Sequence, residues 1–195
     1  MKNILKEILS TSIYLLVVLC AAYLIITYVG QRTQVSGSSM ETTLSENDNL
    51  IVDKITYRFS DPQRFDIIVF PYKPEFAYYT DSKPVYYIKR IIGMPGETVQ
   101  IDEQGNIFIN GEILEEPYGR EVIMYAGRAS EPIVLGDDEY FVMGDNRNNS
   151  SDSREPSVGN IKREDIIGRA WLRIWPFNKF GILKHQYVYR RKGIL

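Results

Sequence analysis

The chain has 195 residues, and its 23 basic and 25 acidic side chains give a formal net charge of −2. Lys and Arg are spread along it without the basic stripe that binds phosphates, so we do not expect nucleic acid as a partner. The single cysteine, Cys20, excludes a disulfide framework and a cysteine-based zinc cluster, and the single histidine, His185, disfavours a Ser-His-Asp mechanism.

The N-terminal region predicts a membrane anchor. Residues 13–30 are mainly apolar and carry no charged side chain, and a helix needs about 17–25 such residues to cross a membrane. We therefore predict a short N-terminus at residues 1–12 and a transmembrane helix at 13–30. A cleavable signal peptide has a similar pattern, but no Ala-x-Ala-like site follows this run. Lys2 and Lys6 favour a cytoplasmic N-terminus, with residues 31–195 on the other side.

From residue 49 onward, short apolar runs alternate with turn residues, which is typical of a mainly β domain. The predicted strands are residues 50–52, 66–70, 85–92 and 140–143, with a hairpin of 98–102 and 106–110 around Gln104 and Gly105. Residues 115–138 are the least regular part, and we expect either a small insertion or a long loop over one end of the sheet.

Both tryptophans lie in residues 170–177, which we interpret as a last strand whose aromatic side chains pack on the core. The alternative is a contact with lipid headgroups, because Trp favours the membrane interface and Arg190, Arg191 and Lys192 would attract anionic lipid.

Three stretches carry residues that are capable of chemistry. Residues 35–44 contain Ser and Gly, and such a run on its own is usually a spacer. Lys89 lies in the apolar strand 85–92, and a lysine acts as a base only when burial lowers its pKa from about 10.4. Its neighbour Arg90 should point to the opposite face of the strand, so that one of the two reaches water.

The third stretch, residues 144–154, is rich in side chains that make local hydrogen bonds. Asp145 and Asp152 alternate with Arg147 and Arg154. Internal ion pairs are therefore expected rather than a calcium site, and the EF-hand ligand pattern is absent.

In this order after one anchor, these motifs resemble the bacterial type I signal peptidases, the membrane-anchored Ser/Lys proteases that remove signal peptides. The matching stretches are residues 37–40, 64–70, 87–97, 144–147 and 152–154. The resemblance implies a signal-peptidase/LexA-like β fold. It also implies that Ser39 is the nucleophile, that Lys89 is the general base, and that Ser150 hydrogen-bonds and orients the Lys89 amine. An ion pair of Asp152 with Arg154 would support the site beside Asp145, without metal or organic cofactor.

Two positions depart from that family's usual pattern, and a third lacks a serine that only some members have. Pro is usual where Thr42 stands, and Gly is usual at Phe65. The Ser39 backbone N–H is the expected oxyanion donor, but the serine that some members add two residues before the nucleophile is replaced by Gly37. Losing one donor costs about 100-fold or more in an acyl-transfer site.

Substrate binding is expected between the segment before Ser39 and the strand that carries Lys89. A signal peptide would add there as an extended strand, with small residues at the first and third positions before the cut. The predicted substrate-binding residues are Ser38, Met40, Ile67, Val69 and Tyr87.

The sequence thus predicts a single-pass protein of the bacterial cell membrane whose extracytoplasmic β domain removes signal peptides from exported preproteins and contacts membrane lipid. Two alternatives remain: a membrane-tethered β domain that binds preproteins without cutting, and a LexA-like regulator that cleaves itself. The anchor and the lack of an N-terminal DNA-binding unit argue against the second alternative.

Overall fold

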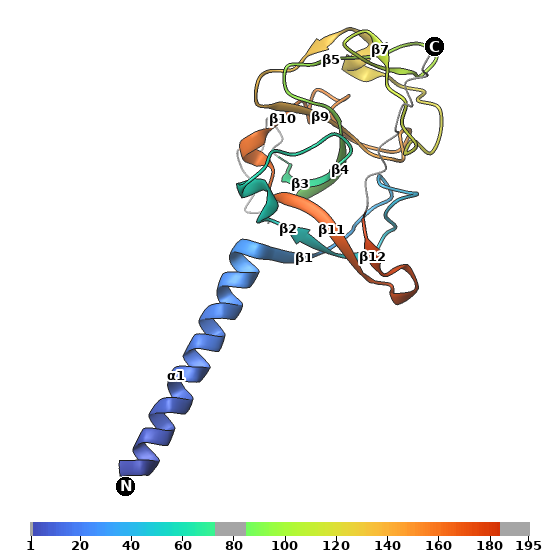
Figure 1. Ribbon diagram of the computed structural model, residues 1–195. Helices are drawn as coiled ribbons and strands as arrows, with labels where there is room; N and C mark the ends of the chain where they lie inside the picture. The colour runs from blue at the N-terminus through green and yellow to red at the C-terminus, as the bar shows by residue number, and fades with distance from the viewer. Residues whose placement is uncertain (1, 73–84, 184–195) are drawn as a thin grey trace, which may run out of the picture.

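The computed structural model describes residues 2–72 and 85–183 (Figure 1). His185, Arg190, Arg191 and Lys192 lie outside the described residues. One long helix projects away from a β domain built of two antiparallel sheets, which agrees with the predicted mainly β fold.

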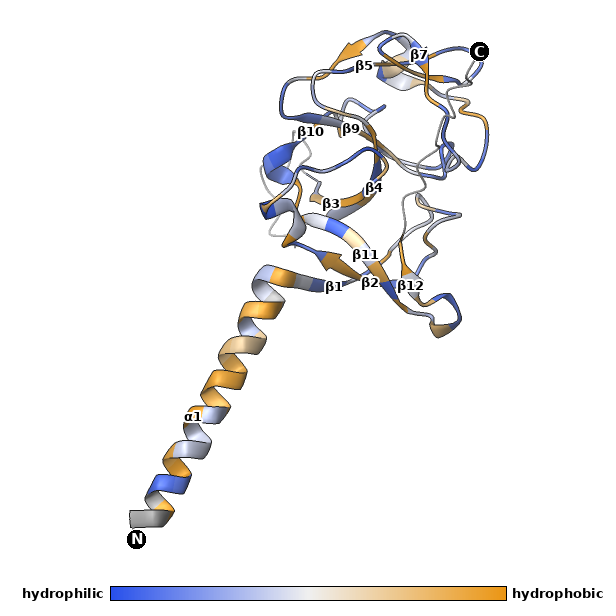
Figure 2. Cartoon of the chain, viewed as in Figure 1, coloured by the Kyte–Doolittle hydropathy of each residue, from blue (hydrophilic) through white to orange (hydrophobic). Residues whose placement is uncertain are grey.

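The helix α1 (Lys2–Leu24) continues into a π-helical turn, η1 (Ile25–Val29), which leads directly into the first strand. Most of its residues are apolar (Figure 2), and its large apolar side chains from Ile8 to Leu24 are exposed. By length and composition, Lys6–Val29 is capable of crossing a membrane.

The remaining elements are short. They are β1 (Gly30–Gln34), β2 (Asn49–Asp53), η2 (Thr56–Arg58), β3 (Ile67–Pro71), β4 (Tyr86–Gly93), β5 (Thr98–Ile101), β6 (Ile107–Ile109), β7 (Glu112–Ile113), η3 (Gly127–Ser130), β8 (Ile133–Val134), β9 (Glu139–Met143), β10 (Ile161–Lys162), η4 (Arg163–Asp165), β11 (Gly168–Trp175), η5 (Phe177–Lys179) and β12 (Gly181–Ile182).

The large sheet has the strand order β1-β2-β11-β3-β4-β9-β10, and β12 pairs with β11. β1 is an edge strand that pairs only with β2 among the described strands. β4 pairs with β3 from Tyr86 to Arg90, but with β9 only from Arg90 onward. Residues 86–89 of β4 therefore keep one edge that no described strand covers, and Lys89 lies in this part.

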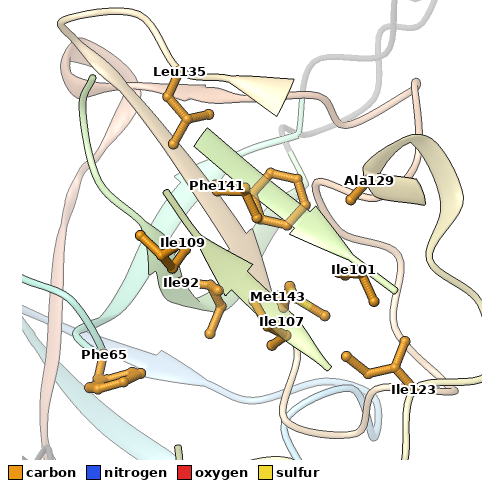
Figure 3. Close-up of a cluster of buried hydrophobic side chains, with 11 residues drawn as sticks. Phe65, Ile92, Ile101, Ile107, Ile109, Ile123, Ala129, Leu135, Phe141 and Met143 are labelled. Carbon is orange, nitrogen blue, oxygen red and sulfur yellow. The ribbon is translucent and has the colours of Figure 1, made fainter. Parts of the chain in front are cut away.

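The small sheet has the order β7-β6-β5-β8, and the predicted hairpin around Gln104 and Gly105 joins β5 to β6. Its inner face packs on β4 and β9 through aliphatic side chains and Phe141 (Figure 3). Gly93 is needed where the sheets meet, because a Cβ there would lie 2.5 Å from Val99 Cγ2.

Each predicted strand is present to within a few residues. The C-terminal stretch 170–177 lies mostly in β11, but two details were wrong. It is not the last strand, because β12 follows it. Its tryptophans are also not core residues, since Trp171 and Trp175 are 39% and 49% exposed and Trp175 contacts Phe177 at the surface.

Candidate active site

Ser39 lies in a packed loop between β1 and β2. The loop closes through hydrogen bonds from Val35 N to Asp48 O (2.8 Å) and from Asn47 N to Val35 O (2.9 Å). Met40 and Leu44 are fully buried in the cluster beneath the loop. Residues 35–44 are therefore not the spacer that such a run usually forms, because apolar anchors inside the Ser-rich run fix the position of Ser39.

Lys89 reaches this loop from β4. Its Nζ lies 2.8 Å from Ser39 Oγ and 3.2 Å from Ile88 O, and the side chain is only 4% exposed. Burial lowers the pKa of Lys89 to about 8, although the charges of Asp152, Asp145 and Glu155 act in the opposite direction. The amine also lies 4.9 Å from the centre of the Tyr87 ring. A substantial neutral fraction therefore faces the hydroxyl at mildly alkaline pH.

Arg90 is buried as well, which corrects the expectation that Arg90 or Lys89 would reach water. Both oxygens of Asp145 accept hydrogen bonds from its guanidinium, at 2.8 and 2.7 Å, and Phe65 O accepts a third at 2.8 Å. The Tyr118 ring covers the guanidinium at 3.6 Å. The two-pronged pair satisfies both charges and connects β4 to the loop after β9.

Residues 144–154 form a rigid loop, but only one of the expected ion pairs is internal to it. Arg154 Nε donates to Asp152 Oδ1 at 2.8 Å, and Gly144 N donates to Asp152 Oδ2 at 3.0 Å. Asp145 instead pairs with Arg90, and Arg147 forms an ion pair with Glu116. The alternation of acidic and basic residues correctly indicated that these side chains form ion pairs. It carried no information about ion-pair partners elsewhere in the chain.

Ser150 does not make the predicted hydrogen bond to Lys89. Its Oγ is buried and has no hydrogen-bond partner among the described residues. The side chain lies against the backbone of Gly144 instead. A Cβ at Gly144 would lie 2.3 Å from Ser150 Oγ and 2.4 Å from Ser39 O. Glycine is therefore required for the close approach of the Ser39 and Ser150 loops, a role that the sequence analysis did not assign.

Two asparagines of the same loop hold Ser38, the residue before Ser39. Asn146 Nδ2 donates to Ser38 O at 3.1 Å, and Asn149 Nδ2 donates to Ser38 Oγ at 2.9 Å. Asn146 N also donates to Ser39 O at 3.0 Å. The density of polar side chains in residues 144–154 was the only signal in the sequence for these contacts.

A groove of about 310 Å³ runs between the end of β1 and the uncovered part of β4, with Ser39 and Lys89 in its wall. Of the five predicted substrate-binding residues, Val69 and Tyr87 line it. Met40 and Ile67 belong to the buried core, and Ser38 is held by the asparagines. The groove residues that sequence reasoning missed are Thr33, Gln34, Val35, Ser36, Val85, Tyr86 and Ile88. Within residues 2–72 and 85–183, no cluster of His, Cys, Asp and Glu is suited to hold a metal ion.

The departures at residues 42 and 65 lie close to this site. The Glu41–Thr42 peptide is cis. Phe65 has a φ of +71°, in the left-handed region that glycine adopts without cost. Its ring is buried and lies 5.2 Å from the Tyr118 ring, centre to centre. The aromatic side chain thus adds packing at a position where its backbone is strained.

Comparison with known proteins gives consistent matches. Residues 7–175 match the family described as "Signal peptidase, peptidase S26". A probable signal peptidase I-2 from Synechocystis sp. is 43% identical over 159 residues, which are 80% of this chain and 68% of that protein. A signal peptidase I from Leptolyngbya laminosa is 43% identical over 80% of this chain and 74% of its own length. A probable signal peptidase I-1 from Synechocystis sp. is 37% identical over 87% of this chain and 83% of its own length.

Proposed function

Because the chain belongs to the signal peptidase family, peptidase S26, we propose that Ser39 and Lys89 are the catalytic pair with which it cleaves signal peptides. The chain is a serine peptidase of the signal peptidase I type. One observation carries the assignment of the pair: Ser39 Oγ and the buried Lys89 Nζ lie 2.8 Å apart, although the residues are 50 positions apart in sequence.

In the proposed mechanism, neutral Lys89 accepts the Ser39 proton while Oγ attacks the scissile carbonyl carbon. The oxyanion that forms is stabilised by the Ser39 N–H. Collapse of this intermediate breaks the peptide bond, and the Lys89 ammonium gives its proton to the departing amine. Lys89 then takes a proton from water, whose oxygen attacks the acyl-enzyme. The signal peptide leaves as a carboxylate, and Ser39 regains its proton.

The groove supports a substrate that binds as an extended strand. β1 and residues 86–89 of β4 both have backbone edges that no described strand covers, and Ser39 lies between them in the groove wall. A peptide inserted there would bond to main-chain groups, while its alternate side chains contact Val69 and Tyr87. We propose that the end of a signal peptide, next to the cleavage site, occupies this groove.

The apolar helix indicates a membrane-anchored protein. We further propose that its N-terminus is cytoplasmic, as Lys2 and Lys6 favour, and that residues 31–195 act on the extracytoplasmic side of the bacterial cell membrane. There they would meet preproteins during export.

The test is cleavage of a preprotein with an Ala-x-Ala site by the purified full chain in detergent. Wild type should cut after the second Ala, whereas Ser39→Ala and Lys89→Ala should lower kcat by about 10³-fold or more. Lys162→Ala, at an exposed lysine on β10, is the matched control and should cut normally. Binding without cleavage would support the tethered binding domain, and cleavage of only its own chain would support the self-cleaving regulator. Normal cleavage by Lys89→Ala would rule out the proposed pair.

A further inference from the structure

Residues 122–125 present apolar side chains to solvent beside the candidate active site. Val122, Met124 and Tyr125 are 70%, 86% and 65% exposed, while Ile123 between them is buried in the core of the small sheet. Large apolar side chains gathered on a surface often mark a binding site. The buried Ile123 fixes the segment, so its neighbours face outward as a result of packing.

The backbone of this segment is bonded to the loop that follows β9. Met124 N donates to Asn148 Oδ1 at 2.9 Å, and Asn148 Nδ2 donates to Val122 O at 2.9 Å. Arg154 Nη1 donates to Tyr125 O at 3.0 Å. Asn148 and Arg154 belong to the loop that also holds Ser38, so the exposed apolar side chains have a fixed position relative to Ser39.

A second pocket, of about 440 Å³, is lined by the apolar side chains of Met124 and Tyr125 and by the polar loop residues 147–151, Arg154 and Glu155. Ser150 and Asn149 line it. Ser150 Oγ and Ser39 O both lie against Gly144, and Asn149 donates a hydrogen bond to Ser38 Oγ. Ser39 therefore lines the first groove, and its carbonyl oxygen and its neighbour Ser38 lie against the loop that lines this pocket.

We propose that this pocket binds the first residues of the mature protein, those that follow the cleaved bond, and that it favours an apolar or aromatic side chain there. The inference rests on the proposed cleavage at Ser39. The part of the substrate that becomes the acyl group occupies the first groove, so the part that leaves as an amine must pass Ser39 on the other side. An extended chain advances about 3.3–3.6 Å per residue, so the second and third residues after the cut lie about 7–11 Å beyond Ser39. In the proposal, the side chains of these two residues contact Met124 and Tyr125.

The experiment compares two peptides that share one signal-peptide end and Ala-x-Ala site. The apolar peptide has Leu and Phe at the second and third positions after the cut, and the polar peptide has Ser at both. For the wild-type full chain in detergent, kcat/KM should be about tenfold higher for the apolar peptide. In the double variant Met124→Ser, Tyr125→Ser this ratio should fall close to 1. Both side chains are exposed, so the fold does not depend on them.

The matched control is Val134→Ser, at an equally exposed apolar residue on β8 of the small sheet, which should keep the wild-type ratio. A wild-type ratio near 1, or an unchanged ratio in the double variant, would overturn the inference. Ser39→Ala is assayed in parallel. Residual cleavage by this variant would mean that the proposed function has failed, which is a separate result from the loss of substrate preference.

Discussion

At the scale of single residues, the proposed mechanism is limited by the proton on Lys89. Its pKa of about 8 leaves roughly one amine in ten neutral at pH 7 and one in two at pH 8. We expect kcat/KM for a preprotein peptide to rise about tenfold per pH unit below pH 8 and to level off above it. Initial rates between pH 6 and 10 test this. If the rise of kcat/KM with pH, its acid limb, continued up to the ordinary lysine pKa, burial would not activate the amine.

The charge of Glu155 should affect the pH at which this acid limb of kcat/KM lies. Its charge favours the protonated form of Lys89, and Ser151 Oγ holds its carboxylate with a 2.7 Å hydrogen bond. Glu155→Gln removes the charge but keeps the shape, so the pKa of Lys89 should fall and the acid limb of kcat/KM should move to lower pH. Glu103→Gln, in the exposed turn of the small sheet, should leave the limb in place. A shift to higher pH in Glu155→Gln would contradict the electrostatic role.

At position 65, a glycine variant should be more stable than an alanine variant, which reverses the usual order of stability. Removing the ring costs about 3–5 kcal/mol of packing in either variant. At a φ of +71°, however, alanine keeps the backbone strain of about 1–2 kcal/mol that glycine relieves. Phe65→Gly should therefore have a higher free energy of unfolding in urea than Phe65→Ala, although both fall below wild type. Greater stability of the alanine variant would mean that position 65 is not strained.

At the scale of elements, the site depends on two loops in contact at Gly144. Gly144→Ala would force Ser39 O or Ser150 away from the new methyl group. A misplacement of about 1 Å costs on the order of 100-fold in rate, so kcat should fall by about that factor with little change in KM. Gly181→Ala, where nothing lies within 4 Å of the added Cβ, is the control. Unchanged kcat in Gly144→Ala would show that the loops move apart without effect on the reaction.

The strands were predictable because the sequence signals for each one lie within its own segment. Alternation and turn residues correctly predicted β5, β6 and the other strands. The sheet order was not predictable, since β11 inserts between β2 and β3 from the far end of the described chain. The same applies to the partners of Arg90 and Arg147, which distant segments supply. Family motifs correctly predicted that Ser39 and Lys89 lie in contact, but they also predicted the Ser150 hydrogen bond, which this structure does not form.

At the scale of the whole molecule, the candidate site lies in the β domain, and the membrane-anchor candidate is the helix. The groove, the candidate pair and the second pocket all lie in residues 30–183, while the helix has no buried share. Contacts near its end are few: Lys54 N donates to Val29 O at 3.0 Å, and Arg58 lies 5.0 Å from the centre of the Tyr28 ring. We therefore expect the domain to fold without residues 1–27.

Removal of residues 1–27 should accordingly leave peptide-bond cleavage intact while slowing the encounter of enzyme and preprotein at a membrane. The truncated chain keeps Val29 and β1, so its kcat/KM for a short peptide in detergent should match that of the full chain. A preprotein in a lipid vesicle is itself held at the membrane by its apolar signal segment. Tethering both partners to one surface raises their effective concentration, and losing it should slow cleavage on the order of 100-fold. Equal rates on vesicles would show that the helix contributes nothing to the meeting of enzyme and substrate, and a loss of peptide cleavage would show that it supports the fold of the site.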